Sequence, residues 1–373
     1  MRKKLIFMIW ALEVGGAERF LVKLLKNLSQ ELFEIKVVCI SRKGVWAEEV
    51  EHSGIPVVSM DKRTGIDPLF LFRLMILLHK EKPDLVNLYL WTAYFWGGLA
   101  AHLVGVKHII VTEQNLDIWK RWYHKFIDKI LMRWMERVVC VSDQVAEFYK
   151  NKIGVPENKI RMIPNAIDLT MFSPSQAPTG LKKKLEVNKD SFLFVCAARL
   201  HEQKAHHILI KAVDILVQRG VEGFHLIIVG EGELRELHET DVRRKNLSRQ
   251  ISFLGLRQDI PDIFQQSDCL VLSSDYEGLS LAILEAMAAR LPVVATDVGG
   301  NAQVVSTGNT GILVPAQRPG LLADAMQAMI EDSSKAKVMG AEGRAYIEQH
   351  FAIEKIAQQT TNLFVDCLKG NQQ

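Results

Sequence analysis

Residues 269–290 read CLVLSSDYEGLSLAILEAMAAR, an apolar run followed by a polar loop and an apolar helical segment. The run at 269–274 is typical of a buried strand, and the segment 279–290 has the length of a helix. A strand that leads directly into a helix is the repeating element of a parallel sheet covered on both faces. The stretch also contains two glutamates, Glu277 before the predicted helix and Glu285 inside it.

The same alternation runs along the chain in both directions. We predict strands at 5–10, 35–40, 55–60, 85–90, 108–113, 137–142, 192–198, 224–230, 251–255, 269–274, 292–297 and 311–315. We predict helices at 17–30, 68–80, 93–104, 118–136, 143–152, 204–219, 233–246, 259–266, 279–290, 319–331, 334–349 and 352–368. The pattern breaks at 161–180, where three prolines and polar residues indicate a linker. The sequence therefore predicts two doubly wound α/β domains, with ligands at the carboxyl ends of the strands.

Composition fits a folded protein of two domains. The 373 residues are 48% apolar and 24% charged, with a net charge of +3 that predicts no general affinity for nucleic acid. Residues 1–170 are mildly basic, with 25 Lys/Arg against 19 Asp/Glu, which favours anionic substrates or an anionic membrane surface. The five widely spaced cysteines indicate a reduced, cytosolic compartment.

One apolar segment has the length of a membrane span. Residues 85–106 contain no Asp, Glu, Lys or Arg. Asn87, His102 and the Gly97-Gly98 pair argue against a span, and a strand followed by a buried helix is the favoured interpretation.

Two glycine-rich or basic loops are candidate ligand contacts. GGAER, with Gly15 and Gly16, follows the first strand, where glycines let a backbone approach an anion or simply make a tight turn. AARLHEQK places Arg199 and Lys204 after the first strand of the second half. Two such cations can converge on one phosphate, although a solvated pair of loop cations is the alternative.

The spacing of Glu277 and Glu285 argues against a hydrolase. Eight residues of continuous helix separate two side chains by about 12 Å and about 80° around the axis. This is too far for two carboxylates to flank one glycosidic oxygen. A loop position for Glu277 and a helix position for Glu285 instead suit a ligand with two hydroxyl-rich parts joined by an anionic bridge, such as a nucleotide-sugar.

Taken together, the motifs resemble the retaining glycosyltransferases of family 4, which have the GT-B fold. GGAER, IPNAID, AARLHEQK, GEGEL, FLG, EGLSLAILEAMA, PVVATDVGG and GILVP follow one another in the family's order and spacing over essentially the whole chain. The resemblance implies two Rossmann-like domains that face a central cleft. It places an acceptor-side domain at 1–165, a donor-binding domain at 166–350, and a final helix within 351–373 that packs back on the first domain.

The resemblance also implies roles for individual residues. Arg199 and Lys204 match the pair that binds the donor diphosphate, and Glu277 matches the residue that holds the donor sugar. Glu285 matches the residue that binds the ribose. The remaining matches are backbone donors to the diphosphate (Gly278, Leu279 and Ser280) and glycines of the first domain beside it (Gly15 and Gly16).

Gln114 departs from the family pattern. The family often has histidine after the V-x-T-E strand, close to the donor sugar, and this chain has IIVTEQN. Glutamine can donate a hydrogen bond to a sugar hydroxyl, but it cannot act as a base. No D-x-D motif occurs, so we expect no metal and no cofactor other than the donor substrate.

Residues 118–137 have six Lys/Arg against two acids, interleaved with aromatic residues at helical spacing. The apolar stripe either packs inside the domain or rests on an anionic membrane. With the second interpretation the expected location is the cytoplasm, at the inner face of the plasma membrane.

The expected function is transfer of a sugar from a UDP- or GDP-sugar to a glycan or lipid-linked glycan, with retention, in bacterial cell-envelope polysaccharide synthesis. Two alternatives stay open: an epimerase or hydrolase of nucleotide-sugars with the same fold, and a non-catalytic subunit that binds a nucleotide-sugar.

Overall fold

The computed structural model describes residues 2–63, 65, 67–117, 119–172 and 180–370. They form two compact units. Unit 1 is Met1–Ala166 with Ile353–Gln373, and unit 2 is Ile167–Ala352. The sequence analysis set the corresponding boundaries at 165/166 and 350/351.

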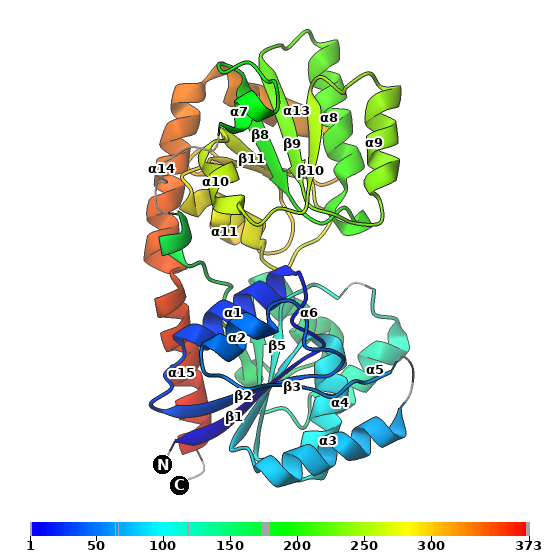
Figure 1. Cartoon of the computed structure of the whole chain (residues 1–373). Helices are drawn as coiled ribbons and strands as arrows, with labels where there is room; N and C mark the ends of the chain where they lie inside the picture. The colour runs from blue at the N-terminus through cyan, green and yellow to red at the C-terminus, as the bar shows by residue number, and fades with distance from the viewer. Residues whose placement is uncertain (1, 64, 66, 118, 173–179, 371–373) are drawn as a thin grey trace. The chain divides into compact units, whose positions relative to one another are not determined.

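Unit 1 contains a seven-stranded sheet in the order β3-β2-β1-β4-β5-β6-β7 (Figure 1). Its strands are β1 (Lys3–Ile9), β2 (Phe33–Cys39), β3 (Val57–Ser59), β4 (Leu85–Tyr89), β5 (His108–Glu113), β6 (Arg137–Cys140) and β7 (Ile160–Met162). Its α-helices are α1 (Gly16–Asn27), α2 (Ala47–His52), α3 (Pro68–Glu81), α4 (Leu90–Leu103), α5 (Trp122–Leu131), α6 (Asp143–Phe148) and α15 (Ile353–Lys369). Neighbouring strands are parallel throughout, as their continuous buried runs predict.

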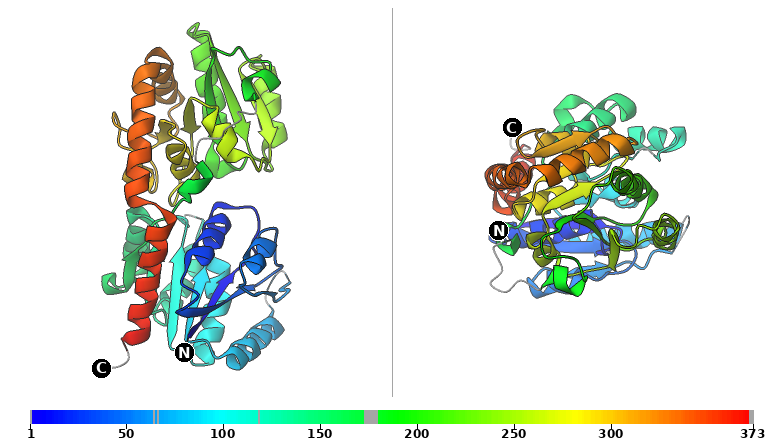
Figure 2. Two further views of the ribbon diagram at one scale, coloured as in Figure 1. Left: turned by 60° about the vertical axis from the view of Figure 1, so that its left-hand side comes forward. Right: turned by 90° about the horizontal axis from the view of Figure 1, so that it is seen from above.

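The last helix, α15, packs against the sheet of unit 1. Figure 2 shows α15, in red, along the strands of unit 1. The Phe364 ring lies 5.9 Å from that of Phe7 on β1 and 6.2 Å from that of Phe33 on β2. Burial of these rings ties the end of the chain to its beginning.

Unit 2 contains a six-stranded parallel sheet in the order β10-β9-β8-β11-β12-β13. Its strands are β8 (Phe192–Ala197), β9 (Phe224–Val229), β10 (Ile251–Gly255), β11 (Cys269–Leu272), β12 (Val293–Thr296) and β13 (Gly311–Val314). Its α-helices are α7 (Leu181–Lys184), α8 (His206–Gln218), α9 (Arg235–Arg244), α10 (Ile260–Gln265), α11 (Leu281–Ala288), α12 (Asn301–Val304), α13 (Pro319–Glu331) and α14 (Ser333–His350). The predicted α/β class with two parallel sheets is confirmed.

Residues 85–106 form β4 and α4, as the favoured interpretation predicted. Among the described residues, no helix has the length and apolar character needed to cross a membrane. The five cysteines are buried and unpaired.

Several short elements were not predicted. β7 has only three residues with an arginine in the middle, so its sequence contains no apolar run. As an edge strand of the sheet it does not need one. It takes the first residues of the predicted linker 161–180 into the sheet of unit 1, whereas 173–179 lie outside the described residues. The short helices α2, α7 and α12 were also missed.

The helix predicted at 118–136 is wrong in its extent, because α5 covers only Trp122–Leu131 and residue 118 is not described. Lys159 holds the turn that follows α5. Its Nζ donates to the carbonyl oxygens of Met132, Arg133 and Met135 at 3.3, 3.0 and 2.7 Å. A basic side chain near the end of a helix can satisfy carbonyl groups that have no partner within the helix.

Candidate active site

The candidate site of unit 2 lies in loops that follow the carboxyl ends of β8, β9, β11 and β12. The loop after β8 contains Arg199, which is exposed, and Lys204, which is only 17% exposed. The loop after β11 contains Glu277, which is 5% exposed. Carboxyl ends of parallel strands meet at one edge of the sheet, which brings these loops together.

Lys204 and Glu277 form an ion pair that their spacing in sequence did not reveal. Lys204 Nζ lies 2.5 Å from Glu277 Oε1, and Ser274 Oγ donates to the same oxygen at 2.7 Å. Gln203 Nε2 donates to the carbonyl of Tyr276 at 2.9 Å, and the Asp275 amide donates back to the carbonyl of Gln203 at 2.9 Å. These bonds join the two loops and fix the carboxylate beside the ammonium.

Glycines allow the neighbouring loops to approach this pair. Gly299, after β12, has a φ of +59°, and a Cβ there would lie 2.1 Å from the carbonyl oxygen of Glu277. The Gly300 amide donates to the carbonyl of Gly278 at 2.6 Å. Gly230, after β9, has a φ of +139°, and a Cβ would lie 2.1 Å from the carbonyl oxygen of Ala198. The GEGEL and DVGG motifs are therefore supports of the loops that hold Arg199, Lys204 and Glu277.

The two glutamates have the positions expected from the sequence relative to α11. Glu277 lies in the loop before the helix, and Glu285 lies within it and is 5% exposed. Gly278, Leu279 and Ser280 connect Glu277 to the helix, with Ser280 at the N-cap position. Glu277 and the amino terminus of α11 thus lie on one short segment, and Lys204 reaches Glu277 from another loop. This arrangement suits a ligand that has both hydroxyl groups and an anionic group.

The candidate residues of unit 1 also follow strand ends. Gly15 is the N-cap residue of α1, after β1, and Gly16 is the first residue of that helix. Gln114 directly follows β5 and is 4% exposed. Neither the oxygen nor the nitrogen of its side-chain amide has a hydrogen-bond partner among the described residues. A buried amide without partners is costly, so this site is suited to a polar ligand.

Lys120 is the centre of a buried ionic cluster in unit 1, which its place among the six Lys/Arg of 118–137 did not reveal. Its side chain is fully buried. Its Nζ lies 2.6 Å from Asp117 Oδ2 and 2.8 Å from Asp128 Oδ2, and donates to the hydroxyls of Tyr94 (2.7 Å) and Tyr149 (2.9 Å). The Asp117-x-x-Lys120 spacing was the available signal, but it did not reveal that the pair turns inward.

Glu113, the last residue of β5, is completely buried near this centre. Burial, followed by the charge of Asp117, raises its pKa well above that of an ordinary glutamate. Burial alone would lower the pKa of Lys120, but the charges of Glu113, Asp117 and Asp128 outweigh it and raise that pKa. The lysine therefore stays charged, and it ties Asp117 to Asp128 of α5.

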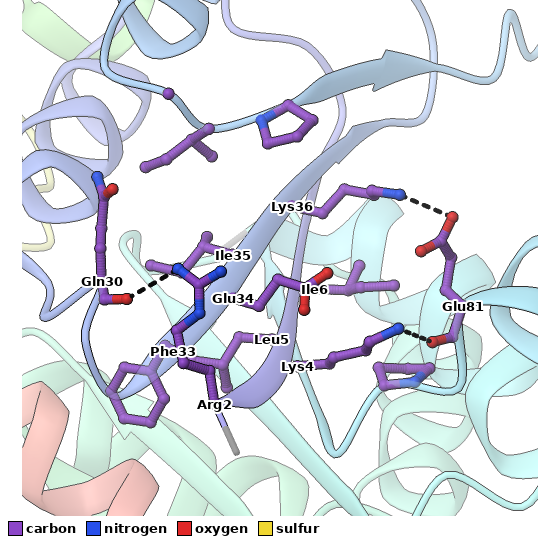
Figure 3. Close-up of a pocket in the computed structure, with 14 residues that line it drawn as sticks. Arg2, Lys4, Leu5, Ile6, Gln30, Phe33, Glu34, Ile35, Lys36 and Glu81 are labelled. Atoms are coloured by element: carbon purple, nitrogen blue, oxygen red, sulfur yellow. Dashed lines mark hydrogen bonds and ion pairs between the residues drawn. The ribbon is translucent and has the colours of Figure 1, made fainter.

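A pocket of unit 1 lies at the other end of the strands (Figure 3). The basic side chains that line this pocket contact acidic or carbonyl groups of the same chain. Lys36 Nζ lies 2.7 Å from Glu81 Oε1, Lys4 Nζ donates to the Glu81 carbonyl at 3.5 Å, and Arg2 donates to the Gln30 carbonyl at 3.2 Å. The amino-terminal parts of β1 and β2 line this pocket. It is therefore separate from the loops of Gly15 and Gln114, which follow the carboxyl ends of their strands.

In the described part of the chain, no three His, Cys, Asp or Glu side chains lie close enough together to hold a metal ion.

The predicted site residues fall into two sets, one in each unit. Unit 2 pairs Lys204 with Glu277 and places Arg199 and the start of α11 at the same edge of its sheet, and unit 1 places Gly15, Gly16 and Gln114 at strand ends of its own sheet.

Comparisons with known proteins agree with this architecture. The model of "Glycosyltransferase Family 4" matches residues 14–171, and that of "Glycosyl transferases group 1" matches residues 179–346. A UDP-Gal:alpha-D-GlcNAc-diphosphoundecaprenol alpha-1,3-galactosyltransferase of Escherichia coli is 28% identical over 95% of this chain and 94% of its own. The lipopolysaccharide core biosynthesis mannosyltransferase LpsB of Rhizobium meliloti is 30% identical over 63% of this chain and 67% of its own.

Solved structures share the fold. Anabaena HepE in complex with UDP and glucose superimposes with a TM-score of 0.86 at 23% identity, covering 98% of this chain and 100% of that one. The two parallel-sheet units have the GT-B fold, and the named relatives are glycosyltransferases. The chain belongs to glycosyltransferase family 4.

Proposed function

We propose that this glycosyltransferase moves a sugar from a UDP- or GDP-sugar to a glycan or lipid-linked glycan acceptor, with retention of the anomeric configuration. The proposed setting is bacterial cell-envelope polysaccharide synthesis: lipopolysaccharide, O-antigen, capsule or exopolysaccharide. The Lys204–Glu277 pair carries the proposal, because it puts a cation for a diphosphate beside a carboxylate for a sugar. The E. coli relative is described as using UDP-Gal, and HepE has been solved with UDP and glucose.

Each residue has a defined task in this proposal. Arg199, Lys204 and the backbone of 278–280 stabilise the diphosphate as its negative charge grows during departure. Glu277 orients the sugar and offers negative charge to its anomeric carbon, and Glu285 binds the ribose. These tasks need positive charge but no divalent ion, and we propose that the reaction requires none.

The first unit contributes neutral groups. Gly15 and Gly16 lie beside the diphosphate, and the Gln114 amide binds a hydroxyl of the donor sugar. Because glutamine cannot take a proton, the acceptor hydroxyl gives its proton to the departing phosphate oxygen. The bond from the anomeric carbon to that oxygen breaks as the bond to the acceptor oxygen forms on the same face.

The test is a panel of UDP-, GDP- and ADP-sugars incubated with and without a lipid-linked acceptor. Consumption of donor that depends on the acceptor, with an axial or equatorial product linkage matching the donor, supports retaining transfer. Donor conversion without acceptor would instead indicate an epimerase or hydrolase, and tight donor binding without turnover would indicate a binding subunit.

We also propose that α5 contacts an anionic membrane on the cytoplasmic side. The apolar stripe of 118–137 does not pack inside the domain: Trp122 is 79% exposed and Phe126 is 61% exposed. The only acid within α5, Asp128, is buried and paired with Lys120. An exposed helix with aromatic residues and cations but no exposed acid suits a surface of anionic lipid.

A further inference from the structure

Helix α3 has two apolar faces, and the fold uses only one of them. Phe70, Leu74 and Leu78 are buried. Leu69, Phe72 and Ile76 are 76%, 61% and 52% exposed, and their spacing of three and four residues places them in one stripe. A surface helix ordinarily turns polar side chains outward, so three large apolar residues in one exposed stripe indicate a partner.

The exposed charges of α3 are cations. Arg73 and Lys80 are exposed, whereas the acids at its two ends are engaged: Asp67 caps the helix through the Phe70 amide, and Glu81 lies 2.7 Å from Lys36 Nζ. Lys129 of α5 is exposed, as is Arg121 at the N-cap of that helix. Apolar side chains bordered by cations fit a surface of anionic lipid, whose phosphates attract the cations.

The two helices are linked through α4, which packs against both. A continuous series of ring contacts crosses α4 from Phe70 of α3 to His124 of α5. It runs Phe70–Trp96 (5.5 Å), Trp96–Phe95 (5.1 Å), Phe95–Trp91 (5.2 Å) and Trp91–His124 (5.4 Å). Figure 1 shows α3, α4 and α5 as neighbours within unit 1. The exposed stripes of α3 and α5 are thus held on one aromatic framework.

We propose that α3 and α5 form one membrane-binding surface, the two-helix surface, whose occupant is an anionic bilayer. The apolar side chains of α3 enter the boundary between headgroups and acyl chains, and Arg73 and Lys80 bind lipid phosphates. This deepens the proposed function, in which an acceptor is presented at a membrane. A second copy of the chain suits the surface less well, because a two-fold contact would bring like cations of the two copies together.

The test is flotation of the full chain with phosphatidylglycerol-rich and with pure phosphatidylcholine vesicles at low salt. The α3 variant is L69S/F72S/I76S, and the α5 variant is W122S/F126S. The matched control is L237S/L321S/V338S, which changes three apolar residues of unit 2 that are 61%, 45% and 61% exposed. We expect the α3 variant to bind anionic vesicles at least about tenfold more weakly than the wild type, and the control to stay within twofold.

Three outcomes would overturn the two-helix surface. The first is that the α3 variant binds vesicles as the wild type does while the α5 variant is impaired. The second is that the wild type binds both kinds of vesicle equally. The third is that the wild type is a dimer in analytical ultracentrifugation and that the α3 substitutions dissociate it. Binding of UDP, measured by calorimetry, should be the same in the α3 variant and the wild type. If vesicles bind as expected but no sugar is transferred, the two-helix surface stands and the proposed function fails.

Discussion

Lys204 Nζ lies 2.5 Å from Glu277 Oε1, although the two residues are 73 positions apart in the chain. Ser274 donates to the same carboxylate oxygen, so Oε1 has two donors, whereas no hydrogen bond to Oε2 is found in the described part of the chain. The carboxylate is thus held by one oxygen, and its second oxygen can accept from a hydroxyl of a ligand. An incoming diphosphate would compete with Glu277 for Lys204.

Ser274 should act as a positioning residue for Glu277. Ser274→Ala removes one bond to Oε1 without touching the ligand, and we expect kcat to fall about tenfold with little change in the affinity for UDP. Ser267→Ala is the control, because Ser267 is also buried and donates to a helix carbonyl, that of Ile263. An equal loss in both variants, or a loss confined to UDP affinity, would contradict this role.

Lys120 should contribute strongly to the stability of unit 1. Lys120→Met leaves the carboxylates of Asp117 and Asp128 without their cation, and loss of one partner of a buried pair costs about 3–5 kcal/mol. The free energy of unfolding in urea measures the effect. Lys129→Met, a change at an exposed position of α5, should cost less than about 0.5 kcal/mol, and a similar small cost for Lys120→Met would refute the buried centre.

Acid should destabilise unit 2 through His206. Burial, with the nearby charges of His238 and Lys204, lowers the pKa of His206 from 6.5 to about 3. Between those values the unfolded chain binds a proton that the folded chain does not. Stability is therefore complete above about pH 6.5 and falls with pH, by about 2 kcal/mol at pH 5.

The His206→Leu variant checks this pH dependence. Its free energy of unfolding should change about 2 kcal/mol less than that of the wild type between pH 7.5 and pH 5. His207→Gln, at the exposed neighbouring position, should keep the wild-type dependence. Parallel pH curves for the wild type and His206→Leu would show that His206 is not responsible.

Chelation should leave transfer unaffected. The cations of Arg199 and Lys204 provide the charge that a divalent ion would otherwise bring to the diphosphate. The rate with purified donor and acceptor is compared before and after treatment with EDTA. A loss of about tenfold or more that Mg²⁺ or Mn²⁺ restores would contradict this part of the proposal.

The sequence predicted the sheets better than the contacts within the site. Long β-branched runs such as 35–40 and 108–113 have few alternatives to a buried parallel strand, and both are strands here. β7 escaped prediction because an edge strand of three residues needs little apolar character. The helix at 118–136 was overextended because its apolar spacing continues past Leu131, whereas the turn that follows α5 is held by Lys159, which is distant in sequence.

The candidate site could likewise be predicted from the sequence only in part. The loop position of Glu277 and the helical position of Glu285 followed from local pattern. The ion pair with Lys204, the hydroxyl of Ser274 and the inward turn of Lys120 depend on packing between segments far apart in sequence, which no spacing within a motif reveals. Gln114 was identified, but only the fold shows that its buried amide has no hydrogen-bond partner among the described residues.

The most direct test of the central claim is the rate of sugar transfer by Glu277→Ala with the donor and lipid-linked acceptor that the wild type uses. Loss of a carboxylate that acts on the reacting sugar should lower kcat by about 10²-fold or more. UDP should still bind, and Glu342→Ala, at an exposed position of α14 outside the site loops, should transfer at the wild-type rate. A wild-type rate for Glu277→Ala would contradict the account.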